Sequence, residues 1–175
     1  MKFIAHRGNI SGPNLEKENE PSYIDDAISL GYYVEIDLRV VKGKYFLGHD
    51  EPQYEVTADW LARRKEMLYV HIKDMDSIEH MLEGSGSPID LHMFFHDSDE
   101  CTITSEGDVW VHPSSKQIKG GIAVMPEVAG AKMNSLMMCD GICTDHVLQY
   151  QEDYNKIEVL HDRRQKNKRS NISNQ

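Results

Sequence analysis

Histidine side chains gather at the ends of the short apolar runs of this sequence. Nine histidines are present, and six of them stand at or just past the end of such a run: His6, His49, His71, His96, His112 and His146. A single histidine in that position is most often an ordinary loop residue. Several histidines that meet at one edge of a sheet would instead supply proton transfer or metal ligation, because the imidazole titrates near neutral pH.

Charged side chains spaced two residues apart accompany these histidines. Glu35 and Asp37 would project from one face of a strand, and His71 and Lys73 repeat that geometry on a later strand. Two carboxylates on a half-exposed strand can simply face solvent, but two that are forced together repel unless a cation lies between them. Such an oxygen-rich site suits Mg²⁺ or Ca²⁺. Together with Arg7, these groups would provide a metal site, positive charges that contact an anionic substrate, and imidazoles for acid/base catalysis. Phosphodiester hydrolysis requires these three features.

The elements that must position these residues follow an alternating pattern. Short runs rich in β-branched and aromatic residues alternate with expected helices at 22–30, 58–67 and 77–82, which is typical of βα units. Seven runs are candidates for parallel strands: 2–5, 33–40, 68–72, 91–95, 109–111, 122–125 and 141–143. The run 45–47 is expected to form a hairpin arm. The pattern predicts an α/β fold, a reduced or incomplete TIM-type (β/α) barrel of roughly seven to eight strands with some helices missing.

Length and charge restrict the organisation and the partners. The 175 residues suit one domain, expected over 1–160, followed by a basic and flexible tail over 161–175. A net charge of −10 argues against a broad nucleic-acid surface. No run is apolar and long enough to insert into a membrane, and no signal peptide is evident, so a cytoplasmic location is expected. A barrel that lacks helices would expose apolar strand backs, and a homo-oligomer is one way to cover them.

Four ordered motifs within the first fifty residues carry a family resemblance. They are IAHRG at 4–8, EN at 18–19, EID at 35–37 and GHD at 48–50. In order and spacing they resemble the glycerophosphodiester phosphodiesterase family, within the phosphatidylinositol-phospholipase-C-like phosphodiesterases. Weaker similarity continues to Lys73 and to DGICTD at 140–145, whereas about 85–135 shows no clear correspondence.

The resemblance implies a TIM-type barrel that cleaves phosphodiesters with one divalent metal, Mg²⁺ or Ca²⁺ in the first instance. In that family the matching residues act as general base and general acid (His6 and His49), hold the metal (Glu35 and Asp37), contact the phosphate (Arg7 and Lys73) or lie near the substrate (Asn19).

Position 71 departs from the family pattern. The family usually carries a third metal-binding glutamate there, and this sequence has His71. A neutral imidazole removes one negative charge from the metal ligands, which weakens Ca²⁺ or Mg²⁺ binding and moves the preference towards Mn²⁺ or another transition metal. Either His71 binds a different metal, or a carboxylate such as Asp97 or Glu127 substitutes, or catalysis is impaired. The presence of both His6 and His49 favours the first two explanations.

The sequence therefore predicts a phosphoric diester hydrolase that acts on a small diester, such as a glycerophosphodiester, by histidine acid/base catalysis. Two alternatives stay open. One is a non-catalytic module that binds a phosphate ligand on the same barrel, and the other is a lyase variant that forms a cyclic phosphate. The nucleophile is water or a neighbouring hydroxyl of the substrate. The alcohol groups of the diester are not readable from the sequence.

Overall fold

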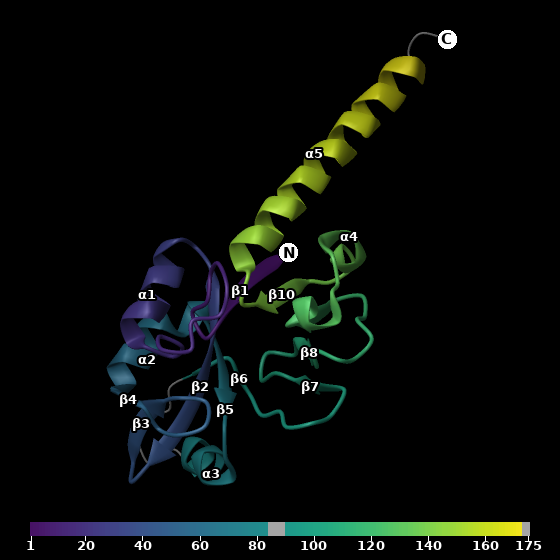
Figure 1. Ribbon diagram of the computed structural model, residues 1–175. Helices are drawn as coiled ribbons and strands as arrows, with labels where there is room; N and C mark the ends of the chain where they lie inside the picture. The colour runs from purple at the N-terminus through teal and green to yellow at the C-terminus, as the bar shows by residue number, and fades with distance from the viewer. Residues whose placement is uncertain (84–89, 173–175) are drawn as a thin grey trace.

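The protein is a mixed α/β domain built on one curled sheet (Figure 1). The computed structural model describes residues 1–83 and 90–172, with side chains to Arg163. The strands are β1 (Lys2–His6), β2 (Tyr33–Val41), β3 (Lys44–Leu47), β4 (Tyr54–Val56), β5 (Leu68–Ile72), β6 (Met93–Phe94), β7 (Cys101–Ile103), β8 (Val109–Val111), β9 (Gly121–Val124) and β10 (Gly141–Thr144). The helices are α1 (Pro21–Ser29), α2 (Ala58–Arg64), α3 (Met75–Glu83), α4 (Met133–Leu136) and α5 (Val147–Ile172), with 3-10 turns η1 (Lys65–Met67) and η2 (Pro126–Ala129).

The sheet forms a half-barrel. Parallel pairing runs in the order β6-β5-β2-β1-β10-β9-β8, so the seven expected parallel strands all occur. The β3–β4 hairpin extends β2 and β7 pairs with β8, both in antiparallel fashion. Within the described ranges no ladder joins β6 to β7 or β8, although the Met93 carbonyl accepts a hydrogen bond from the Ser105 amide across that gap. The predicted barrel is thus confirmed only as an open half-barrel, because among the described strands β6 forms a ladder with β5 alone.

Helices cover the first half of the sheet far better than the second. α1 follows β1, α2 precedes β5, and α3 follows β5. Beyond β6 the connections contain the strand β7 and then only the short η2 and α4, as the short spacings of this region predict. Helix α3 begins at Met75, two residues earlier than expected, because the Asp74 side chain accepts a hydrogen bond from the Ser77 amide at 2.8 Å.

Strand alternation divides the core into an outer and an inner layer. Val34, Ile36 and Leu38 of β2 pack outward with α1 and α2, and the even-numbered residues of β5 do the same. The inner layer holds a separate apolar cluster of Ile4, Tyr69, Phe94, Trp110, Ile122, Val124 and Cys143. The odd-numbered residues of β2 and β5 therefore face the inside of the half-barrel, where the polar residues of interest lie.

Helix α5 leaves the domain. Figure 1 shows it extending away from the sheet. In its first half, Tyr150, Tyr154 and Ile157 pack in the apolar cluster around α4. Residues 161–172, expected as part of a flexible tail, continue this helix, and their flexibility stays a prediction. Residues 173–175 lie outside the described part. Among the described helices, none combines the length and apolar character needed to cross a membrane.

Candidate metal and acid–base site

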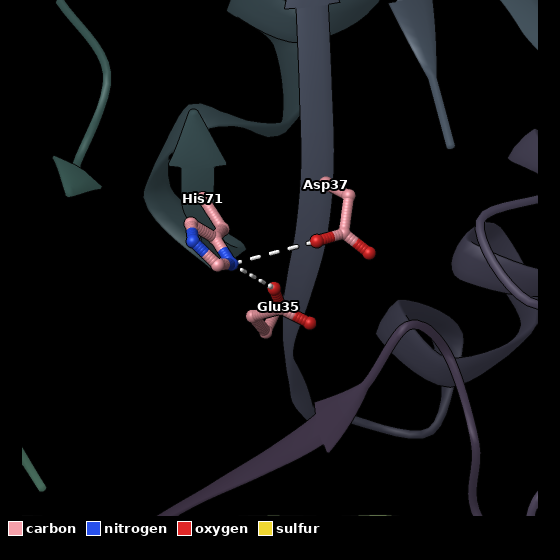
Figure 2. A group of neighbouring side chains, drawn as sticks. All are labelled: Glu35, Asp37 and His71. Carbon is pink, nitrogen blue, oxygen red and sulfur yellow. Dashed lines mark ion pairs between the residues drawn. The ribbon is translucent and has the colours of Figure 1, made fainter. Parts of the chain in front are cut away.

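Two neighbouring parallel strands bring two carboxylates and an imidazole together. Glu35 and Asp37 project from β2 to the inside of the half-barrel, and β5 pairs alongside with Asp37 opposite His71. One ligand atom from each residue lies within 4.8 Å of the other two, and Figure 2 shows the three side chains converging. Glu35 and Asp37 are 2% and 0% exposed, respectively. Burial at this depth is costly for two like charges unless a cation compensates them.

Unpaired atoms in this cluster fit a metal ion. Glu35 Oε2 and Asp37 Oδ1 are buried without a hydrogen-bond partner. His71 Nε2 donates to the His96 carbonyl at 2.9 Å, so in the neutral ring Nδ1 carries a lone pair. That lone pair points towards Glu35 Oε1 and Asp37 Oδ1, at 3.8 and 3.5 Å. Three acceptors that face one another are compatible with a divalent cation, and the His96 carbonyl is the kind of outer partner that orients a ligating imidazole.

The pKa values of the two carboxyl groups are shifted in opposite directions. Burial, followed by the charge of Asp37, raises the pKa of Glu35 above its ordinary value. Burial would also raise the pKa of Asp37, but the hydrogen bond that His71 Nδ1 donates when its ring is protonated, together with the charges of Arg7 and Lys73, outweighs burial and lowers it. Asp37 is consequently the anchored anion of the pair, and Glu35 is the carboxylate whose charge the protein itself compensates least.

Asp37 is fixed by groups from three other parts of the chain. Arg7 Nε lies 2.9 Å from Asp37 Oδ2, and Lys73 Nζ lies 3.4 Å from Oδ1. The Asn19 side chain donates a hydrogen bond to Asp37 Oδ2 at 2.9 Å, and its Oδ1 accepts one from the Asp37 backbone amide at 3.0 Å. Arg7 and Lys73 also line the pocket described below, whereas Asn19 is 1% exposed and does not. Asn19, expected near the substrate, therefore occupies the place of a positioning residue for Asp37.

His6 is held by a residue from the far end of the chain. Strand β1 pairs with β10, and His6 Nδ1 meets Asp145 Oδ1 at 2.8 Å, with Nε2 left 3.9 Å from Glu35 Oε2. Burial lowers the pKa of His6, but the hydrogen bond to Asp145 and the charge of Glu35 together raise it above its ordinary value. If Nδ1 donates to Asp145, the neutral ring keeps its lone pair on Nε2, towards the carboxylate cluster.

Asp145, the partner of His6, is not among the site residues that the sequence predicts. Its backbone amide donates to Glu127 Oε1 at 3.0 Å, and its Oδ1 also accepts a hydrogen bond from Asn9 at 2.8 Å. The one available signal was its place directly after β10, since strand-end residues of adjacent parallel strands meet at one edge.

His49 occupies a more open position. Its side chain is 42% exposed, and Nδ1 lies 2.8 Å from Asp50 Oδ1. The loop itself is firmly held, because Arg39 donates to the His49 carbonyl at 2.6 Å and to the Gly48 carbonyl at 3.3 Å. Gly48 has φ +149°, and a Cβ there would lie 2.1 Å from the Glu51 carbonyl oxygen, so only glycine fits this turn.

A pocket of about 570 Å³ connects these groups. Five of the six strand-end histidines line it: His6, His49, His71, His96 and His112. The sixth, His146, lies in a separate recess beside Ser11 and Leu148. Asp97 lines the pocket as an exposed side chain, and Glu127 does not line it. Within the described residues the metal-competent group contains His71 and neither of these two carboxylates.

In comparisons with protein families, curated proteins and solved structures, nothing matches this chain. The family resemblance of the first fifty residues therefore stays a prediction.

Proposed function

We propose that this protein is a metal-dependent phosphodiesterase that hydrolyses a small phosphodiester of the glycerophosphodiester type, on a shortened relative of the TIM-type barrel. The observation that carries the proposal is the convergence of three acceptor atoms, from Glu35, His71 and the fully buried Asp37, at the wall of a pocket that Glu35 and His71 line. Two cationic side chains, His6 and His49 line the same pocket. Each group that phosphodiester hydrolysis needs then lies in the lining of one cavity or, for Asp37, directly behind it.

Glu35, Asp37 and His71 would hold the metal. Their donor set of carboxylate oxygens and one imidazole nitrogen accepts Mg²⁺ or Ca²⁺ and suits Mn²⁺ better than an all-oxygen set would. A bound divalent cation supplies Lewis-acid stabilisation of negative charge on the phosphoryl oxygens.

Arg7 and Lys73 give the pocket a fixed positive wall. Both line the cavity and both contact Asp37, so their positions do not depend on a ligand. A phosphodiester anion would be drawn to this wall, and charge that develops during attack would be stabilised by side chains already oriented.

His6 has the geometry of a general base. Asp145 fixes the ring through Nδ1, so that Nε2 is free to take a proton from the attacking hydroxyl of water or of the substrate. His49, on the held loop after β3, would return a proton to the leaving alcohol. Its exposure to solvent makes proton exchange easy between turnovers.

The test is hydrolysis of bis(p-nitrophenyl) phosphate and of glycerophosphodiesters with Mg²⁺, Ca²⁺ or Mn²⁺, in the unmodified protein and in His6→Ala and His49→Ala. We expect turnover that requires the metal and falls steeply in His6→Ala. Absence of metal-dependent and histidine-dependent turnover on every diester would refute the proposal. Detection of a cyclic phosphate product by ³¹P NMR would assign the substrate hydroxyl as nucleophile and favour the lyase alternative.

A phosphate-binding module without turnover is the second candidate. This candidate is favoured by the position of His49, the proposed general acid. Its side-chain partner, Asp50, is exposed, so His49 is not held by the buried hydrogen bonds that fix His6. In that case the diester would bind with a dependence on Arg7 and Lys73, and no hydrolysis would be observed with any of the three metals.

A further inference from the structure

The side chains that line the pocket after β6 and β8 have no role in the chemistry above, where only the His96 backbone carbonyl takes part. His96 follows β6, and Trp110 and His112 lie in and directly after β8, with Pro113 beside them. We call these four residues the second wall. Its two imidazole rings lie 5.6 Å apart between centroids and nearly perpendicular, at 88°. They are therefore close enough for one small ligand group to contact both.

Each imidazole uses one nitrogen to hold its own loop. His96 Nε2 donates to the Asp99 carbonyl at 2.7 Å, because a carbonyl can only accept. His112 Nδ1 accepts the Ser114 amide at 3.4 Å and lies 2.9 Å from Ser114 Oγ. In the neutral rings the tautomers are thus opposite: His96 keeps a lone pair on Nδ1, and His112 carries its proton on Nε2.

The remaining two nitrogens form a complementary pair. Among the described residues neither His96 Nδ1 nor His112 Nε2 has a hydrogen-bond partner. The second wall therefore has one acceptor and one donor available on side chains that line the cavity, with Trp110 and Pro113 in the same lining. A hydroxyl group donates and accepts, and a group with two hydroxyls can satisfy both nitrogens while its carbon face packs on the apolar residues.

Other ligand groups fit this wall less well. A purely apolar group would leave both nitrogens unpaired when water is displaced. A second anionic group would meet the lone pair of His96 and the carboxylate of Asp97, which lines the same cavity.

We propose that His96 and His112 form a specificity subsite that binds a hydroxyl-bearing alcohol group of the diester. The proposal rests on the proposed function of the metal-side groups, since it assigns the substrate class of the same pocket. His96 and His112 act here on binding and not on the reacting phosphate.

The experiment compares methyl glyceryl phosphate with methyl propyl phosphate, which differ only in the two hydroxyl groups. With Mn²⁺ present, we expect the unmodified protein to prefer the glyceryl diester by about tenfold in kcat/KM, which corresponds to about 1.4 kcal/mol. His96→Phe and His112→Phe keep a planar ring and should each reduce this preference by about threefold, and the double variant should abolish it. His146→Phe is the matched control, because His146 lies outside the pocket and should keep the full preference.

The outcomes separate the two proposals. Turnover without discrimination between the diesters, or an unchanged preference in the double variant, would overturn the subsite while leaving the proposed function intact. If neither diester is turned over, the proposed function fails, and the subsite is tested by the ratio of the two dissociation constants in calorimetry. An equal affinity for both diesters would then overturn it. Circular dichroism of each variant establishes that the fold is retained.

Discussion

Two polar clusters lie inside the same half-barrel, at opposite ends of its strands, and they are built differently. At the carboxyl ends, the metal-competent group contains buried oxygens with no hydrogen-bond partner. At the amino ends, Lys2 donates to Asp108 at 2.7 Å and to Tyr69 at 2.8 Å, and the Tyr69 hydroxyl donates to Asp108 at 2.9 Å. None of the three residues of this amino-end cluster has an unpaired buried atom.

The difference teaches where function and stability lie in this molecule. A buried polar group that is fully hydrogen-bonded stabilises and specifies the fold. One that is left unpaired lowers the free energy of unfolding, and a bound ligand can supply its missing partner. We therefore infer that the amino-end cluster stabilises the fold at the amino ends of the strands. The carboxyl-end cluster could hold a metal ion, and under the proposed function a bound cation would compensate the cost of its unpaired oxygens.

The largest expected effect follows from removal of a carboxylate charge at the site. We expect Glu35→Gln to weaken Mn²⁺ affinity by at least about 100-fold, because a ligand charge is lost. The metal-free variant should be no less stable than the unmodified protein, since burial and Asp37 raise the pKa of Glu35 and its charge is unfavourable there. Thermal unfolding with and without Mn²⁺ measures both effects. An equal increase in Tm on adding Mn²⁺ to the two proteins would place the metal elsewhere.

The next effect concerns the orientation of His6. We expect Asp145→Asn to lower kcat by about 10²- to 10⁴-fold, because an amide no longer fixes the tautomer that leaves Nε2 free. The matched control is Asp50→Asn, since Asp50 also meets a histidine Nδ1 at 2.8 Å but its side chain is 91% exposed. That exposed contact should change kcat by less than about threefold. Equal losses in the two variants would contradict the special role of the buried pair.

A smaller effect is expected where the site meets solvent. Arg39→Gln removes the guanidinium that binds the Gly48 and His49 carbonyls, so kcat should fall by about tenfold with little change in KM. The loss should be greater for an alkyl diester than for bis(p-nitrophenyl) phosphate, because nitrophenolate leaves without a proton. Arg39→Lys should recover part of the activity. A rise in KM alone would show that Arg39 acts on substrate binding and not through His49.

The smallest effect is predicted for the amino-end cluster. Asp108→Asn should lower the unfolding free energy by about 1 kcal/mol, or about 2–4 °C in Tm, because Asp108 is partly exposed to solvent. Turnover at pH 7 should stay within about twofold of the unmodified protein. Asp26→Asn, on the exposed side of α1, is the control. A strong loss of turnover in Asp108→Asn without loss of stability would remove the contrast between the two clusters.

The same variant gives a pH signature. Burial would raise the pKa of Asp108, but hydrogen bonds from Lys2 and Tyr69 lower it below the ordinary value of 3.8. Its stabilisation is therefore fully present above that value and is lost as the pH falls through the lowered pKa. The Tm difference between the unmodified protein and Asp108→Asn should shrink below about pH 4, where Asp108 loses its charge. His92 Nε2, 3.8 Å from Asp108 Oδ2, adds a separate change at the pH where its imidazole gains a proton. Circular dichroism melts across this range measure it.

The sequence by itself determined which side chains share a face. The spacing of two between Glu35 and Asp37, and between His71 and Lys73, is enough to place each pair inside the half-barrel once the strands form, because side chains alternate along a strand. The seven parallel strands followed from their apolar runs in the same way. These features depend only on residues near one another in the chain, so the pattern of the sequence is enough to predict them.

Only the tertiary structure decided which of these faces meet and what each group bonds. His6 and Asp145 are 139 positions apart in the chain and become partners through the β1–β10 register. The opposite tautomers of His96 and His112 depend on backbone groups of their loops, and the open edge at β6 depends on how few residues pair there. Strand register and loop hydrogen bonds arise from long-range packing, which no local spacing in the sequence records.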